Sequence, residues 1–209
     1  MQMLSYTSRF FEEAYKIINK VYFNDELPMA MITLQSSPGS FAYITTKKIW
    51  IDDENQYYEI NISTEYLMRD TSELLASLCH EMVHCWCLTR GIRDTSRGST
   101  YHNKRFRDEA EKRGLIITYV NKAIGYSDTK PSEEFIGAMK EYGLLDTKIN
   151  HFRMIPQHTD SSSTSKPKKK SSTRKYVCSN PSCSVTVRAT RDVNIICADC
   201  NMPMVKVDT

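Results

Sequence analysis

One short stretch constrains this chain more than any other: Cys79-His80-Glu81-Met82-Val83-His84. It contains a His-Glu-x-x-His pattern inside a predicted helix. Positions i and i+4 lie one above the other on a helix, so the imidazoles of His80 and His84 can reach one metal ion. Glu81 stays beside that ion without binding it, where it can accept a proton from a zinc-bound water. The stretch therefore predicts a zinc site with Glu81 as general base.

Residues at both ends define the helix that carries this pattern. Asp70 is the predicted N-cap, with Glu73 as its capping-box partner, and Gly91 is the predicted C′ residue. The predicted apolar side of the helix consists of Leu74, Leu75, Leu78, Met82, Cys85 and Trp86. The histidines fall outside it, which predicts one side for the core and another for the metal. The alternative is an ordinary amphipathic helix with two incidental histidines.

Length and composition favour an intracellular protein. The 209 residues suffice for one medium domain and a small appendage. The sequence has no apolar run of about 18 residues and no N-terminal basic stretch followed by an apolar one. We therefore expect no membrane association and no secretion, and a location in the cytoplasm, nucleoid or nucleus. Seven cysteines in two groups suit a reducing compartment and a metal site better than a disulfide framework.

Short patterns divide the first 156 residues into helices and strands, which predicts an α+β domain with a small antiparallel or mixed sheet. Apart from the metal-binding helix, the expected helices are one with Thr7 or Ser8 as cap that ends near Phe23, one over His102–Arg113, and one from Thr129 or Ser132 to Gly143. The expected β-rich runs are Met31–Leu34, Phe41–Ile44, Lys48–Ile51, Glu59–Ile62 and Leu115–Val120.

The third zinc ligand is not determined by spacing alone. A catalytic zinc needs three protein ligands and one open position. Metzincins place a third histidine ten residues after the first, where this chain has Arg90, so that class is excluded. His102 and Glu109 remain as candidates; they share a face of one predicted helix but are not both expected to bind. The cysteines of this part, Cys79, Cys85 and Cys87, are expected to be core thiols.

Further motifs give this part of the chain a family resemblance. His80–His84, Tyr101–Phe106 and Ala110–Leu115 resemble, in this order, the pattern of the SprT-like metalloproteases, and Tyr22–Pro28 matches a segment that precedes it. The resemblance covers roughly residues 5–120. It implies a zincin-like minimal metalloprotease domain whose zinc ligands are His80, His84 and His102. Asn103 departs from the family's pattern, which usually has glycine there.

A second metal site is predicted near the C-terminus. Cys178-x4-Cys183 and Cys197-x2-Cys200 form two pairs, and four thiolates around one structural zinc allow 34 residues to fold without a large core. Strands are expected at Val185–Val187 and Asn194–Ile196. A zinc ribbon here also matches the architecture of SprT-type proteins. Residues 157–175, a serine/threonine tract followed by a lysine cluster, are predicted to form a flexible basic linker.

We therefore expect a metalloprotease domain (1–156), a basic linker (157–175) and a four-cysteine zinc ribbon (176–209), with one catalytic and one structural Zn²⁺. Residues 157–209 carry nine basic and four acidic residues, whereas residues 1–156 carry 19 and 21. The resemblance implies an endopeptidase acting on DNA-bound proteins, because some members cleave proteins crosslinked to DNA. Linker and ribbon are expected to contact DNA phosphates without sequence readout. The alternative is a non-catalytic DNA- or protein-binding module with structural zinc sites, which would not need Glu81.

Overall fold

The computed structural model of the chain describes residues 3–155 and 173–207. The chain divides into two compact units, Met1–Pro156 and Gln157–Thr209. Residues 157–172 of the predicted linker lie outside the described residues. The last residues assigned to that linker, Arg174 and Lys175, instead begin strand β9 (Arg174–Cys178), where they pair with a neighbouring strand. No helix among the described residues is long and apolar enough to cross a membrane.

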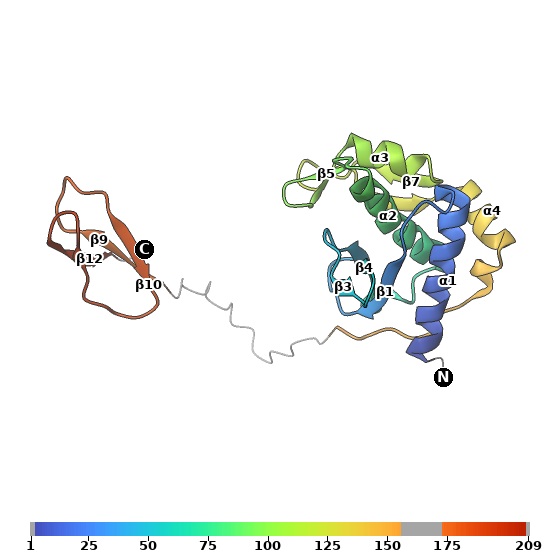
Figure 1. Cartoon of the computed structure of the whole chain (residues 1–209), viewed down its shortest axis with the longest axis horizontal. Coiled ribbons are helices and arrows are strands. Elements are labelled where there is room, and N and C mark those ends of the chain that lie inside the picture. The colour runs from blue at the N-terminus through green and yellow to red at the C-terminus, as the bar shows by residue number, and fades with distance from the viewer. Residues whose placement is uncertain (1–2, 156–172, 208–209) are drawn as a thin grey trace, which may run out of the picture. The chain divides into compact units, whose positions relative to one another are not determined.

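The N-terminal unit is an α+β domain built around a mixed sheet (Figure 1). The sheet is centred on strand β4, which pairs with β1 in parallel and with β2 and β3 in antiparallel orientation. Each of the four β-rich runs predicted before residue 63 overlaps one of these strands. Their bounds are β1 (Ala30–Gln35), β2 (Ala42–Ile44), β3 (Trp50–Ile51) and β4 (Gln56–Ser63).

The central strand β4 is buried on both faces, but in different ways. Ile60 and Ile62 belong to the hydrophobic core. The alternate residues Glu59 and Asn61 are also buried, and their side-chain oxygens accept hydrogen bonds. The Glu59 carboxylate accepts a hydrogen bond from Trp50 Nε1 at 2.6 Å, and Asn61 Oδ1 accepts one from a β1 backbone N–H at 2.7 Å. These bonds hold the edge strands in register with β4.

Helix α2 carries the His-Glu-x-x-His pattern and lies at the centre of the unit (Figure 1). It contacts α1, α3, β2, β4 and β8. Because neighbours surround it, burial extends beyond the predicted apolar side and includes Ala76, Val83 and Cys87. The helices are α1 (Leu4–Phe23), α2 (Thr71–Thr89), α3 (Lys104–Glu111) and α4 (Glu133–Glu141), with short 3₁₀ turns at Thr64–Tyr66 and Leu144–Asp146.

The predicted ends of α2 are confirmed, but its capping box is not. The Asp70 side chain accepts a hydrogen bond from the backbone N–H of Ser72, and Gly91 follows the helix at φ +65°. Glu73 forms an ion pair with Arg69 at 3.2 Å. The carboxylate of Glu73 therefore binds a side chain on the surface of the helix instead of accepting a hydrogen bond from the backbone N–H of the N-cap residue.

The start of α1 was predicted too late in the chain. The helix begins at Leu4, and the carbonyl oxygen of Met3 accepts backbone hydrogen bonds from Tyr6 and Thr7. Thr7, one of the two expected caps, is fully buried within the helix, and its Oγ1 lies 3.3 Å from His151 Nε2. Its hydroxyl group is thus used in a tertiary contact, which local sequence does not reveal.

The helix predicted over His102–Arg113 is shorter, and His102 lies outside it. Asn103 is the N-cap, since its Oδ1 accepts from the backbone N–H of Arg105 and Phe106. Thr129 likewise precedes α4, which Ser132 caps. His102 and Thr129, which were predicted to lie in or at the start of these helices, instead lie on short antiparallel strands. These strands are β5 (Thr95–Ser96) with β6 (Tyr101–His102), and β7 (Leu115–Thr118) with β8 (Asp128–Pro131).

The C-terminal unit is an antiparallel sheet around four cysteines, consistent with a zinc ribbon. Its small core consists of Tyr176, Cys178, Cys197 and Met204. Two of its strands were expected, near Val185–Val187 and Asn194–Ile196, and both lie slightly further along the sequence than predicted. The other two strands were not predicted. In spatial order the strands are β10 (Thr186–Ala189), β9 (Arg174–Cys178), β12 (Met202–Val207) and β11 (Ile196–Cys197).

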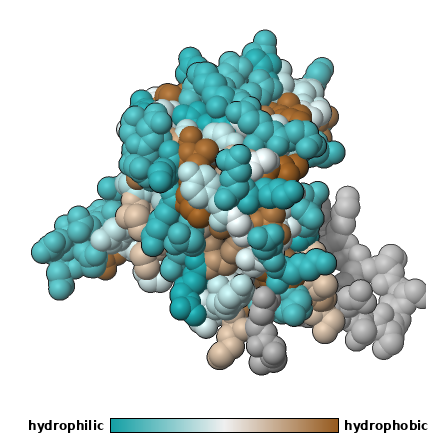
Figure 2. Space-filling model, turned by 90° about the vertical axis from the view of Figure 1, so that its right-hand side faces the viewer, coloured by the Kyte–Doolittle hydropathy of each residue, from teal (hydrophilic) through white to brown (hydrophobic). Residues whose placement is uncertain are grey.

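The face of the molecule shown in Figure 2 is mostly hydrophilic. Its hydrophobic residues form small separate patches rather than one continuous area. This fits the burial of the apolar side of α1, whose Phe11, Ala14 and Ile18 are completely inaccessible to solvent.

Candidate metal centres

The side chains of His80, His84 and His102 converge on one point. The Nε2 atoms of His80 and His84 are 3.2 Å apart, as are those of His80 and His102, and those of His84 and His102 are 3.1 Å apart. Two ligand nitrogens in a tetrahedral zinc site, with Zn–N distances of about 2.0–2.1 Å, lie about 3.3 Å apart. The three nitrogens therefore outline one face of a tetrahedron of nearly the size that zinc requires.

The partners of the opposite ring nitrogens of His80 and His84 are compatible with lone pairs that face this point. His84 Nδ1 lies 2.5 Å from Asp94 Oδ2, and because an ionised carboxylate only accepts hydrogen bonds, Nδ1 carries the proton. In the neutral ring this leaves a lone pair on Nε2. His80 Nδ1 lies 2.7 Å from the Thr129 hydroxyl group. Lone pairs this close repel one another unless a cation lies between them, so the donor set fits a metal ion.

Electrostatics keep two of the histidines in the form that binds metal. Burial, with additional contributions from His84 and His102, holds the pKa of His80 well below its ordinary value. Burial and the proximity of His84 lower the pKa of His102 to about 4. Both rings are therefore neutral at neutral pH, and a metal ion does not have to displace a proton from them.

Glu81 lies on the same helix but is not part of the histidine cluster. Its side chain lines the cleft at the cluster, although the residue is only 7% exposed. Burial raises the pKa of Glu81 to about 7, while His84 and a backbone hydrogen bond from Ile44 oppose this rise. A carboxylate with a pKa near neutrality is suited to accepting and returning a proton. Sequence reasoning assigned this role to Glu81, and its position is compatible with it.

The cleft has a volume of about 470 Å³ and is built from several segments. Strand β2, helix α2, the β5–β6 turn and the start of β8 all contribute to its walls. Tyr101 and Tyr119, whose hydroxyl groups are of a kind that stabilises oxyanions, do not line it. Tyr101 lies beneath the Arg97 guanidinium group, and Tyr119 packs edge-on against Tyr126. Their packing gives no support to that role.

Asp94 and Thr129 are functional candidates that the sequence analysis missed. Each contacts the outer nitrogen of one histidine of the cluster and so orients its ring. Asp94 lies in the loop after α2, and its residue is 6% exposed. No spacing rule links it to His84, because the loop has no periodicity. The only available signal in the sequence was an aspartate ten residues after His84.

We expect the Asp94→Ala substitution to weaken zinc binding at the histidine cluster by about 10- to 100-fold, because the His84 ring loses the acceptor that fixes its orientation. Asp94→Asn retains an oxygen acceptor and should fall between the parent and the alanine variant. Competition with a zinc chelator measures both affinities. Asp128→Ala is the matched control, since it removes a carboxylate from the same cleft without touching a histidine. Equal affinity of the Asp94→Ala variant and the parent would contradict the prediction.

The alternative third ligand, Glu109, is used elsewhere. Its carboxylate binds Lys112 at 2.7 Å and Arg113 at 2.9 Å, and these partners contribute to lowering its pKa. The expected core thiols Cys79, Cys85 and Cys87 are all fully buried. Burial raises the pKa of each to about 12, so they remain protonated and unsuited to metal binding.

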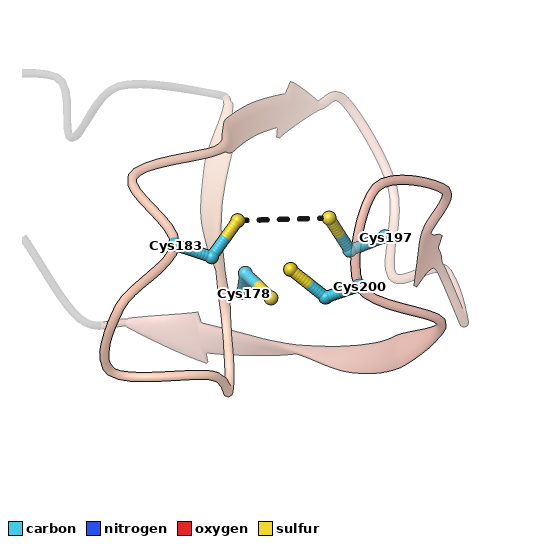
Figure 3. Close-up of side chains that lie close together, drawn as sticks. All are labelled: Cys178, Cys183, Cys197 and Cys200. Atoms are coloured by element: carbon cyan, nitrogen blue, oxygen red, sulfur yellow. Dashed lines mark hydrogen bonds between the residues drawn. The ribbon is translucent and has the colours of Figure 1, made fainter.

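The second candidate centre consists of Cys178, Cys183, Cys197 and Cys200. Figure 3 shows their sulfur atoms directed into one space between two loops. All four lie within 4.8 Å of one another, and Cys183 and Cys197 are 3.8 Å apart. With Zn–S bonds of about 2.3 Å, two sulfurs of a tetrahedral site lie about 3.8 Å apart. The unusual four-residue spacing is accommodated by a turn at Asn180, whose backbone N–H and side-chain amide donate to Cys178 and Cys200 at 3.4 Å.

Searches of curated proteins and of solved structures found no match to this chain. The sequence model of the SprT-like family matches residues 11–124, more than half of the chain. The matched segment includes the whole histidine cluster and Glu81. The chain therefore belongs to the SprT-like family.

Proposed function

We propose that this chain is a zinc-dependent endopeptidase that acts on DNA-associated proteins. The observation that carries the proposal is the combination of three converging histidine nitrogens with a buried Glu81 of raised pKa in one cleft. A purely structural zinc site needs neither an open cleft nor a carboxylate next to its ligands. This combination favours catalysis over a binding module with structural zinc.

The residues of the chain have separate roles in the proposed reaction. His80, His84 and His102 hold the zinc, which when bound supplies a Lewis acid for the peptide carbonyl group and a water of lowered pKa. Glu81 accepts a proton from the attacking water and returns it to the leaving amine. Asp94 and Thr129 keep two of the imidazole rings in position.

The edge of the sheet supports an extended peptide as substrate. Strand β2 lines the cleft, and among the described residues no strand pairs with its outer edge. A substrate segment can therefore add to this edge through main-chain hydrogen bonds, which are independent of side-chain identity. This favours unfolded or locally extended protein segments over folded ones.

The charge of the cleft supports basic substrates. The described residues that line it include Glu81, Asp94 and Asp128 but no lysine or arginine. Asp94 is engaged by His84, whereas Asp128 is exposed and forms no ion pair with a described residue. An uncompensated carboxylate near the catalytic centre attracts lysine or arginine side chains. DNA-associated proteins are rich in such residues, which agrees with the proposed substrate class.

The ribbon offers a surface for DNA phosphates. Lys175 and Arg188 lie directly opposite each other on adjacent antiparallel strands, and no described acidic residue pairs with either. On the opposite face of the sheet, Asp192 forms ion pairs with Arg174 at 3.0 Å and with Lys206 at 2.9 Å. Two adjacent unpaired cations repel each other and are stabilised by an anion. A DNA backbone would supply that anion, in addition to any contact from the lysine-rich segment before residue 173.

The test of the proposal is cleavage of a basic DNA-binding protein with and without single- or double-stranded DNA. We expect zinc-dependent cleavage that DNA stimulates at low salt and that high salt suppresses, because phosphate contacts release counterions. Replacing both Lys175 and Arg188 with alanine should reduce DNA stimulation but leave cleavage without DNA unchanged. The double replacement of Arg174 and Lys206 removes the same charge and serves as control, with a smaller effect. Absence of cleavage under every condition by the zinc-loaded chain would refute the proposal.

A further inference from the structure

The third histidine of the cluster is held differently from the other two. His80 and His84 each have a side-chain partner at Nδ1, Thr129 and Asp94. His102 Nδ1 is buried and has no hydrogen-bond partner among the described residues. His102 also lies on a strand of only two residues, β6, instead of on a helix. Apart from the packing of its ring against Phe106, its position is set by contacts of its backbone.

Those contacts come from the segment Val120–Tyr126, which we call the clamp loop. His102 N–H donates to the carbonyl of Ile124 at 3.0 Å, and the carbonyl of His102 accepts from Tyr126 N–H at 3.0 Å. On its other side His102 pairs with Thr95 of β5. The backbone of the histidine is thus fixed from both sides.

The clamp loop is closed by bonds that depend on Asn121. The Asn121 side-chain oxygen accepts from the backbone N–H of Ala123 at 2.8 Å and of Ile124 at 3.2 Å. The backbone carbonyl of Asn121 accepts from Gly125 N–H at 2.9 Å. These bonds direct the Ile124 carbonyl group toward His102. An asparagine side chain suits this position because it can replace backbone partners within a tight turn.

Gly125 is required by both conformation and space. Its φ is +70°, and a Cβ built on it would lie 2.1 Å from the carbonyl oxygen of His102 and 3.0 Å from the Tyr101 ring. Real Cβ atoms essentially never approach another atom to within 3.0 Å, so the backbone at His102 would have to move by close to an ångström. Metal–ligand distances tolerate only about 0.2 Å. A side chain at this position therefore conflicts with the placement of the third ligand.

We propose that the clamp loop positions the third metal ligand, and that Asn121 and Gly125 are its positioning residues. The inference deepens the proposed function and rests on its histidine metal site. It assigns a role to a segment that follows β7 and contains no metal ligand. The same loop carries Ile124, which lines the cleft, so the position of the ligand and the shape of the cleft are coupled.

The test compares Gly125→Ala with Gly143→Ala in the full chain. Gly143 also has a φ of +70°, but the nearest atom to its ideal Cβ lies 3.9 Å away, so this control carries the same backbone strain without the clash. Competition with a zinc chelator should show affinity at the histidine cluster reduced by about 100-fold for Gly125→Ala and unchanged for Gly143→Ala. The four-cysteine zinc serves as internal reference and should be retained by both variants.

A second pair of variants, both at Asn121, keeps the inference testable if Gly125→Ala does not fold. Asn121→Ala should weaken zinc binding at the histidine cluster, whereas Asn121→Asp, which keeps an oxygen acceptor, should largely restore it. Unchanged far-ultraviolet circular dichroism would exclude general unfolding as the cause. Parent-like zinc affinity of a folded Gly125→Ala variant would overturn the inference. A parent chain that binds zinc at the histidines without cleaving protein would instead refute only the proposed function.

Discussion

Replacing Glu81 with glutamine is expected to reduce peptide cleavage by about 100- to 10,000-fold while zinc content remains at the level of the parent chain. Glutamine has nearly the same shape as glutamate, but its amide cannot accept a proton from water. Glu81 is not part of the histidine cluster, so the metal-binding atoms are unaffected. The measurement combines steady-state cleavage of a DNA-bound protein with metal analysis of the same preparation.

The matched control for this substitution is Glu73→Gln on the same helix. Glu73 is exposed and pairs with Arg69, so its loss should leave both cleavage and zinc content unchanged. Folding of the Glu81→Gln variant is not expected to suffer, because burial already disfavours the charged form of this carboxyl group. Cleavage by the Glu81→Gln variant at the parent rate would show that the proposed proton transfer is wrong.

The second large effect is expected at the four-cysteine centre. The parent chain should contain two zinc ions, and Cys197→Ser should contain one and lose the fold of the C-terminal unit. Structural zinc contributes about 10–16 kcal/mol in small domains, and among its described residues the core of this unit has four buried members. Metal analysis gives the stoichiometry, and limited proteolysis shows whether the C-terminal unit has become accessible.

Cys79→Ala is the control for this second prediction. It removes a fully buried thiol that lies in the hydrophobic core and not in a metal cluster of the described residues. The variant should retain both zinc ions, although the small cavity lowers the stability of the N-terminal unit. A parent chain with a single zinc that Cys197→Ser does not change would refute the ribbon site.

The features predicted correctly from the sequence are those with local determinants. The His80–His84 spacing places two imidazoles side by side on one helix wherever that helix lies, and the cysteine pairs need only short turns to come together. The ends of α2 follow from Asp70 and Gly91 for the same reason. The resemblance to the SprT-like family added His102, which local spacing could not separate from Glu109.

The features that were missed depend on contacts between distant segments. Asp94 and Thr129 are defined as candidates only by the histidines that they touch, and 49 residues separate Thr129 from His80. The hydroxyl group of Thr7, an expected cap of α1, likewise contacts His151, which is 144 residues away in the sequence. Asn121 and Gly125 were a detectable turn signal between two strands. Their role could not be predicted, because it depends on the backbone of His102 lying next to that turn.

The central position of α2 has a thermodynamic consequence. Two of the three histidines and Glu81 lie on a helix that is surrounded by α1, α3, β2, β4 and β8. Unfolding this helix disperses the metal ligands, so an ion that binds only the native state opposes unfolding by mass action. At a free zinc concentration 100 times its dissociation constant this amounts to about 2.7 kcal/mol. Zinc supply would then affect the stability of the folded chain as well as the proposed activity.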